Sequence, residues 1–186
     1  MSEPLPATEG RGVETLRVLI VDDHDLFRTG LRNLLEEQGV HIAGEAGSGG
    51  EAVRLVREIA PDVVVMDLNM PGMGGVEATR HIAAIAPLTR VVVLTISDED
   101  ADVLDAIMAG ACGYLLKDSS IHELMAGIEA ASRGEALISP GIAAKVLQRI
   151  RATSAQPEIA DTIRSELSDR EIQVLKLIAN GTDNAL

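Results

Sequence analysis

The chain has 186 residues, which is enough for one full domain and part of a second. Hydrophobic residues make up 46% of it but aromatic residues only 1%, so its core must consist of aliphatic side chains. The net charge is −13, and all of it falls in residues 1–139, which hold 10 basic and 23 acidic residues. Nucleic acids and anionic lipids repel such an acidic segment, so any DNA contact must come from elsewhere.

Residues 1–15 contain prolines and glycines, but neither a basic start nor an apolar stretch long enough for a signal peptide. We therefore expect a disordered leader and a cytoplasmic protein. Charged residues interrupt every later hydrophobic run, and none reaches the roughly 20 apolar residues that a membrane span needs. The sequence thus predicts no association with a membrane.

Five short runs of branched apolar residues predict five strands, at 17–21, 41–46, 63–67, 91–95 and 113–117. Segments with apolar residues at helical spacing lie between these runs and after the last one. In order, they carry Phe27, Leu31, Leu34 and Leu35; Ala52, Val53, Val56 and Ile59; Val76, Ile82 and Ile85; Val103, Ile107 and Met108; Leu124, Ile128 and Ala131. Strict alternation of strand and helix implies parallel strands with helices on both faces. The predicted fold is therefore an α/β fold with a doubly wound, five-stranded parallel sheet.

The pattern changes after the fifth helical segment. A short helical stretch starts at Pro140, and residues 152–158 are rich in Ser, Ala, Gln and Pro, which indicates a linker. Ser168 and Glu171 then form a capping box before an amphipathic run that Gly181 closes. We expect a new helix there, at the start of a second domain.

Polar residues stand where four of the predicted strands end. Asp22 and Asp23 end the first strand, Asp67 ends the third, Thr95 ends the fourth and Lys117 ends the fifth. In open α/β sheets, ligands bind outside the carboxyl ends of the strands, at the point where the strand order reverses. We therefore expect these side chains to form one site.

Crowded carboxylates repel one another unless a cation lies between them. Oxygen ligands without His or Cys favour a hard ion such as Mg²⁺, which leaves room for a phosphoryl oxygen. Asn69 lies two residues beyond Asp67 and could offer its backbone carbonyl to the ion. With Mg²⁺ and Lys117 neutralising a phosphoryl group, Asp67 can act as the nucleophile that forms an aspartyl phosphate. Thr95 can then donate its hydroxyl to the phosphate.

Four motifs that follow one another at the strand ends resemble the receiver family of response regulators, over about residues 15–135. They are Val21-Asp22-Asp23-His24, Asp67-Leu68-Asn69-Met70-Pro71-Gly72-Met73-Gly74-Gly75, Leu94-Thr95 and Gly113-Tyr114-Leu115-Leu116-Lys117-Asp118. The resemblance implies a flavodoxin-like sheet with the strand order 2-1-3-4-5, and Mg²⁺ as the cofactor. It also implies the role of each site residue: metal ligands Asp22 and Asp23, phosphoacceptor Asp67, phosphoryl-binding residues Thr95 and Lys117, and aromatic switch residue Tyr114.

Asp118 follows Lys117 where many receivers have a proline. Together with Asp-Asp-His after the first strand, this is similar to the NarL/FixJ/LuxR class. Residues 167–181 separately resemble the first helix of LuxR-type DNA-binding domains, and no recognition helix follows before Leu186, so we expect a truncated form of a longer protein. The predicted organisation comprises four parts: a leader at 1–15, a receiver domain at 16–136, a linker at 137–164 and a fragment of a DNA-binding domain at 165–186.

The resemblance implies a regulatory phosphoacceptor protein rather than an enzyme. A sensor histidine kinase would phosphorylate it, and phosphorylation would promote a homodimer. The full-length protein would bind promoter DNA through its helix-turn-helix, whereas this chain would not.

Three alternatives share some of these features. A phosphotransfer enzyme of the haloacid-dehalogenase type also uses a strand-end Asp and Mg²⁺, but it needs a second Asp where this chain has Asn69. A flavodoxin-like FMN binder needs a Ser, Thr and Gly loop after the first strand, where Asp22 and Asp23 would repel the phosphate. A stand-alone receiver that acts only through protein contacts would not need the complete acidic set.

Overall fold

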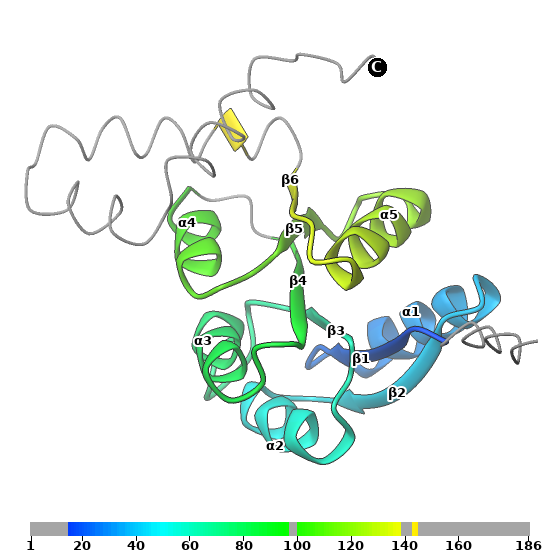
Figure 1. Cartoon of the computed structure of the whole chain (residues 1–186), viewed down its shortest axis with the longest axis horizontal. Helices are drawn as coiled ribbons and strands as arrows, with labels where there is room; N and C mark the ends of the chain where they lie inside the picture. Colours follow the sequence, from blue (N-terminus) through cyan, green and yellow to red (C-terminus); the bar gives the residue numbers. More distant parts are fainter. Residues whose placement is uncertain (1–14, 97–99, 139–142, 145–186) are drawn as a thin grey trace, which may run out of the picture.

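The computed structural model describes residues 15–96, 100–138 and 143–144. Within these residues strands and helices alternate and form a parallel sheet with the order β2-β1-β3-β4-β5-β6 (Figure 1). The strands are β1 (Arg17–Val21), β2 (His41–Ala46), β3 (Val63–Met66), β4 (Arg90–Thr95), β5 (Gly113–Leu116) and β6 (Leu137–Ile138). The helices are α1 (Asp25–Glu37), α2 (Gly49–Ile59), α3 (Gly75–Ile85), α4 (Asp100–Met108) and α5 (Ile121–Ser132).

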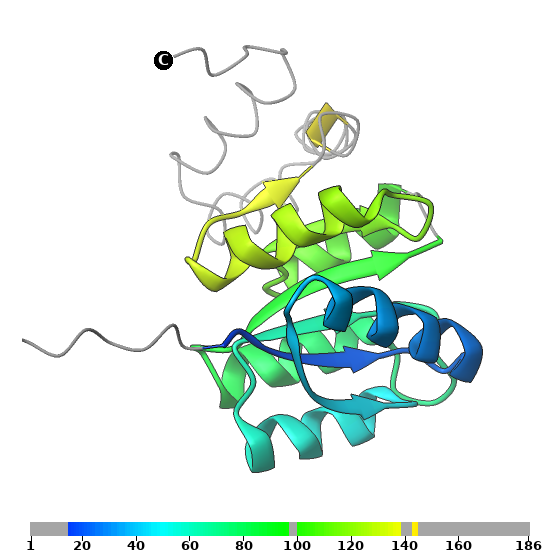
Figure 2. The ribbon, with the colours of Figure 1, turned by 90° about the vertical axis from the view of Figure 1, so that its right-hand side faces the viewer.

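The sheet is covered on both faces, by α1 and α5 on one side and by α2, α3 and α4 on the other (Figures 1 and 2). The central strand β3 contributes to both cores. Val63 and Val65 pack into the core under α1 and α5, whereas Val64 and Met66 pack into the core under α2 and α3. All four side chains are buried, which explains why β3 is uniformly apolar instead of alternating.

The predicted α/β fold and the strand order 2-1-3-4-5 are confirmed, and a short strand that the sequence did not predict extends the sheet. This strand, β6, pairs in parallel with β5 through Gly113 opposite Leu137 and Tyr114 opposite Ile138. It has only two residues, too few for an alternating pattern to be recognised. The segment predicted as a linker therefore begins with residues that belong to the sheet.

Not every apolar residue at helical spacing in α1 is buried. Leu31 and Leu35 are buried, but 48% of Leu34 is exposed. Neighbouring residues on a helix point about 100° apart, so Leu34 lies beside the buried stripe and not within it.

Several predictions fall on residues that the structure does not describe. These are the leader up to residue 14, most of the linker, and the helix with its capping box at 168–171. In the part of the chain that is described, no helix combines the length and the apolar character needed to cross a bilayer.

Candidate functional site

Four strand ends bring polar side chains to one edge of the sheet. Asp22 follows β1, Asp67 follows β3, Thr95 ends β4 and Lys117 follows β5. Backbone hydrogen bonds between neighbouring strand ends align these positions. The Asp67 N–H donates to the carbonyl of Val21 at 2.9 Å, and the Lys117 N–H donates to the carbonyl of Thr95 at 2.9 Å. Asp22, Asp67 and Thr95 are all buried. Parallel register therefore places two buried carboxylates, a hydroxyl and an ammonium side by side.

The ammonium of Lys117 lies between the two buried carboxylates. Its Nζ is 2.6 Å from Asp22 Oδ2 and 3.1 Å from Asp67 Oδ2, and it stands 4.4 Å from the ring centroid of Phe27 on α1. Burial by itself lowers the pKa of Lys117, but the hydrogen bond with Asp22 and the charge of Asp67 outweigh it, so the pKa is raised. Lys117 is therefore charged at neutral pH and holds the carboxylates together.

We expect Lys117→Met to lower the free energy of unfolding of the metal-free protein by about 2 kcal/mol at neutral pH, because two buried carboxylates lose their shared cation. Because the folded-state pKa of Lys117 is raised, its stabilisation is complete below the ordinary lysine pKa. It is lost as the pH rises through the raised value. Urea unfolding from pH 7 upward should thus show the difference between parent and variant shrinking in the alkaline range.

Arg54→Met serves as the control for this variant. Arg54 pairs with Glu58 on the exposed side of α2, so its replacement should cost no more than about 0.5 kcal/mol. If the Lys117→Met protein were as stable as the Arg54→Met protein at neutral pH, Lys117 would not stabilise the two buried carboxylates.

The acidic residues form a pocket that fits a cation. Ligand atoms of Asp22, Asp23, His24 and Asp67 all lie within 4.8 Å of one another. Among the described residues, Asp67 Oδ1 is buried and accepts no hydrogen bond. An unpaired carboxylate oxygen is costly to bury unless it meets a donor or a cation. The pocket of Asp22, Asp23 and Asp67 is therefore consistent with a metal site.

His24 caps this pocket from the solvent side. Its Nδ1 lies 2.9 Å from Asp23 Oδ1 and 3.3 Å from Asp22 Oδ1, and 69% of its side chain is exposed. The ring therefore contacts both carboxylates from the exposed side of the pocket.

The other two predicted site residues are Asn69 and Tyr114. Asn69 is exposed in the loop between β3 and α3, two residues past Asp67, and its role as a carbonyl ligand stays a prediction. Tyr114 is fully buried in β5, in the same apolar cluster as Val93 of β4 and Val103 of α4. A shift of α4 would therefore change the packing around Tyr114. The switch role of Tyr114 also stays a prediction.

The first turn of α3 packs directly against the backbone of Asp67. The N–H of Gly75, the first residue of α3, donates to the carbonyl of Leu68 at 3.0 Å. A Cβ atom at Gly75 would lie 2.1 Å from the carbonyl oxygen of Asp67 and 2.8 Å from Cα of Leu68. Only glycine allows this approach, so Gly75 helps to set the position of Asp67.

The family of the chain follows from a comparison with known proteins. The family described as the response regulator receiver domain matches residues 18–129, which is more than half of the chain and includes all four strand ends of the site. The chain belongs to the response regulator receiver family.

Relatives of this receiver also extend beyond the receiver domain. The response regulator GacA of Pseudomonas aeruginosa is 42% identical over 166 residues, which cover 89% of this chain and 76% of GacA. The transcriptional regulatory protein LiaR of Bacillus subtilis is 42% identical over 172 residues, which cover 91% of this chain and 79% of LiaR. The crystal structure of a LuxR-family two-component response regulator from Aurantimonas sp. matches with a TM-score of 0.68 and 44% identity, covering 73% of this chain and 98% of that one.

The comparisons identify the protein as a two-component response regulator of the NarL/LuxR class. It is therefore a regulatory phosphoacceptor protein, and a response regulator implies a cognate sensor histidine kinase as its partner. Family membership decides against the independent phosphotransfer enzyme and the FMN binder. Sequence reasoning placed Phe27 only in an apolar stripe and missed its contact with Lys117, because no motif marks a contact between residues 90 positions apart in the chain.

Proposed function

We propose that Asp67 is the phosphoacceptor of this response regulator. The observation that supports the assignment is the asymmetry of its carboxylate: Lys117 holds Oδ2, whereas Oδ1 is buried and has no donor among the described residues. Oδ1 is left for the cation, so Oδ2, once Lys117 releases it, is the oxygen that can attack phosphorus. When the sensor kinase donates, the P–N bond of its phosphohistidine breaks as the bond between this Asp67 oxygen and phosphorus forms.

Mg²⁺ is the proposed cofactor, held by the carboxylates of Asp22, Asp23 and Asp67 and by the backbone carbonyl of Asn69. The donor set supports this choice, because oxygen ligands suit a hard cation. When bound, Mg²⁺ would offset the negative charge of the phosphoryl oxygens. Lys117 already reaches Asp67 and can exchange that contact for one with a phosphoryl oxygen.

Thr95 and Tyr114 carry the proposed signal away from Asp67. Thr95 lies at the end of β4, beside Lys117, where its hydroxyl can donate to a phosphate on Asp67. The added charge and its acceptor oxygens supply the differential interaction that a conformational shift requires. The shift would repack the surface of α4, β5 and α5 and promote a homodimer.

The proposed output is control of transcription in the cytoplasm. In the full-length protein, two DNA-binding domains brought together by the dimer would bind paired half-sites of promoter DNA. The proposed organisation is a leader at 1–15, a receiver domain at 16–136, a linker at 137–164 and part of a DNA-binding domain at 165–186.

The test of this function combines labelling with metal removal. The parent protein, incubated with acetyl phosphate and Mg²⁺, should shift to a slower band in a phosphate-affinity gel, and EDTA should abolish the shift. Asp23→Ala should label at least tenfold less, as expected for the loss of a metal ligand. In EDTA the same variant should be more stable than the parent by about 1 kcal/mol, because one of three crowded carboxylates is gone.

Asp118→Ala is the matched control, since Asp118 is an exposed carboxylate next to Lys117 and outside the pocket. It should label like the parent and gain no stability in EDTA. Labelling of the parent that persists in EDTA would overturn the metal-dependent function.

A further inference from the structure

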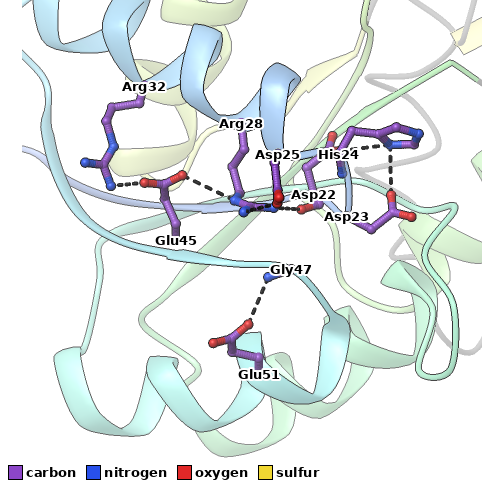
Figure 3. A network of polar contacts seen from close by, with 9 residues as sticks. All are labelled: Asp22, Asp23, His24, Asp25, Arg28, Arg32, Glu45, Gly47 and Glu51. Atoms are coloured by element: carbon purple, nitrogen blue, oxygen red, sulfur yellow. Dashed lines mark hydrogen bonds and ion pairs between the residues drawn. The ribbon is translucent and has the colours of Figure 1, made fainter.

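Arg28 of α1 uses all three of its side-chain nitrogens beside the acidic pocket (Figure 3). Its Nη1 donates to the backbone carbonyl of Asp22 at 2.5 Å, its Nη2 to Asp25 Oδ1 at 2.6 Å, and its Nε to Glu45 Oε2 at 3.2 Å. Only 16% of the side chain is exposed. The planar guanidinium is therefore fixed between the start of α1, the end of β1 and β2.

The bond to the carbonyl of Asp22 acts on the loop that carries the acidic residues. This loop consists of Asp22, Asp23 and His24, since β1 ends and α1 begins on either side of it. The N–H of His24 donates to Asp22 Oδ1 at 2.9 Å, which closes the loop from within. The carbonyl of Asp22 shares a rigid peptide plane with the nitrogen of Asp23. Holding that carbonyl therefore fixes the peptide unit from which the Asp23 side chain projects.

Glu45 of β2 keeps the guanidinium in place. Its carboxylate lies between two arginines of α1, with Oε2 accepting from Arg28 and Oε1 paired with Arg32 (Figure 3). Arg32 is more exposed than Arg28, at 42% of its side chain, and its ion pair is with Glu45 rather than with the acidic loop. The two arginines thus share a partner and a helix, but only Arg28 reaches Asp22.

We propose that Arg28 is a positioning residue that holds the loop between β1 and α1 in the conformation that binds the metal. The inference rests on the proposed Mg²⁺ site and adds to it a residue that does not touch the ion. Arg28 acts through the backbone of Asp22, and Glu45 and Asp25 orient its guanidinium. Residues that orient metal ligands typically change metal affinity by about 10- to 100-fold when replaced.

Positioning and simple electrostatics predict opposite effects on Mg²⁺ affinity. A guanidinium this close to the pocket repels a cation, so removing its charge should tighten Mg²⁺ binding if charge alone mattered. If Arg28 instead positions the loop, removing it should weaken Mg²⁺ binding despite the lost repulsion. A lysine at the same position keeps the charge but cannot make three directed hydrogen bonds in one plane.

The experiment measures the Mg²⁺ dissociation constant of the parent, Arg28→Gln, Arg28→Lys and Arg32→Gln by isothermal titration calorimetry. We expect both Arg28 variants to bind Mg²⁺ about tenfold more weakly than the parent. Arg32→Gln removes a similar charge from the same helix and should bind as tightly as the parent or more tightly. Melting in EDTA checks that each variant is folded.

A metal-independent measurement accompanies the titration. Hydrogen exchange of the His24 amide in EDTA should be at least severalfold faster in both Arg28 variants, because the loop that buries its bond to Asp22 is no longer held. The exchange rate should not change in Arg32→Gln. Arg28→Gln with parental or tighter Mg²⁺ affinity, or with parental exchange at His24, would overturn the positioning role. A parent protein that binds no Mg²⁺ would instead overturn the proposed metal site itself, and the positioning role with it.

Discussion

Asp67→Asn is expected to take up no phosphate from acetyl phosphate and Mg²⁺, under conditions that label the parent. An amide keeps the volume of the carboxylate but is not a nucleophile, and it is a poorer ligand for a hard cation. The effect on stability should be small, because the variant loses the ion pair with Lys117 but is also relieved of repulsion from Asp22. Intact-mass measurement should show one phosphoryl group on the parent and none on the variant.

Asp62→Asn is a suitable control for this loss. Asp62 precedes β3 at the opposite end of the strand from Asp67, is exposed, and accepts a hydrogen bond from the N–H of Arg17. It should take up phosphate at the parental rate. If the Asp67→Asn protein were phosphorylated, the acceptor would have to be another residue of the pocket.

The strand ends of the site could be predicted because topology alone brings them together. Parallel strands end at the same edge of a sheet, so Asp22, Asp67, Thr95 and Lys117 could be placed at one edge once their strands were recognised, and the strand order that the resemblance implied brought them close together. β3 was the clearest of these strands, since burial on both faces makes it uniformly apolar.

The residues that surround the site could not be predicted, because their positions depend on tertiary contacts between helices and strands, and no local sequence pattern indicates such contacts. In the sequence, Arg28 is simply one charged residue on an amphipathic helix. Its hydrogen bond to the carbonyl of Asp22 depends on how α1 packs against β2. The ring of Phe27 near Lys117 depends in the same way on how far the Lys117 side chain, which follows β5, extends towards α1. Periodicity shows that a helix has an apolar face but not which residue lies at its margin, as Leu34 demonstrates.

Gly75→Ala is expected to damage both stability and phosphorylation, although residue 75 bears no functional group. A Cβ atom there would lie 2.1 Å from the carbonyl oxygen of Asp67, far inside van der Waals contact, so either α3 or the peptide of Asp67 must move. Overpacking of this kind should lower the free energy of unfolding by about 3 kcal/mol. Phosphorylation should slow by about 100-fold, because displacing a reacting group by about 1 Å has effects of that size. Urea unfolding and the rate of labelling by acetyl phosphate measure the two losses.

Gly74→Ala separates this close approach from a general intolerance of side chains at the start of α3. Gly74 is the N-cap residue with φ −71°, which any residue can adopt, and its nearest neighbour to an added Cβ is the carbonyl oxygen of Leu68 at 3.4 Å. Because alanine is a poorer N-cap than glycine, this variant should lose no more than about 1 kcal/mol and should label at nearly the parental rate. The contrast between adjacent glycines tests whether α3 sets the position of Asp67. Equal losses in the two variants, or parental behaviour in Gly75→Ala, would mean that the first turn of α3 does not set that position.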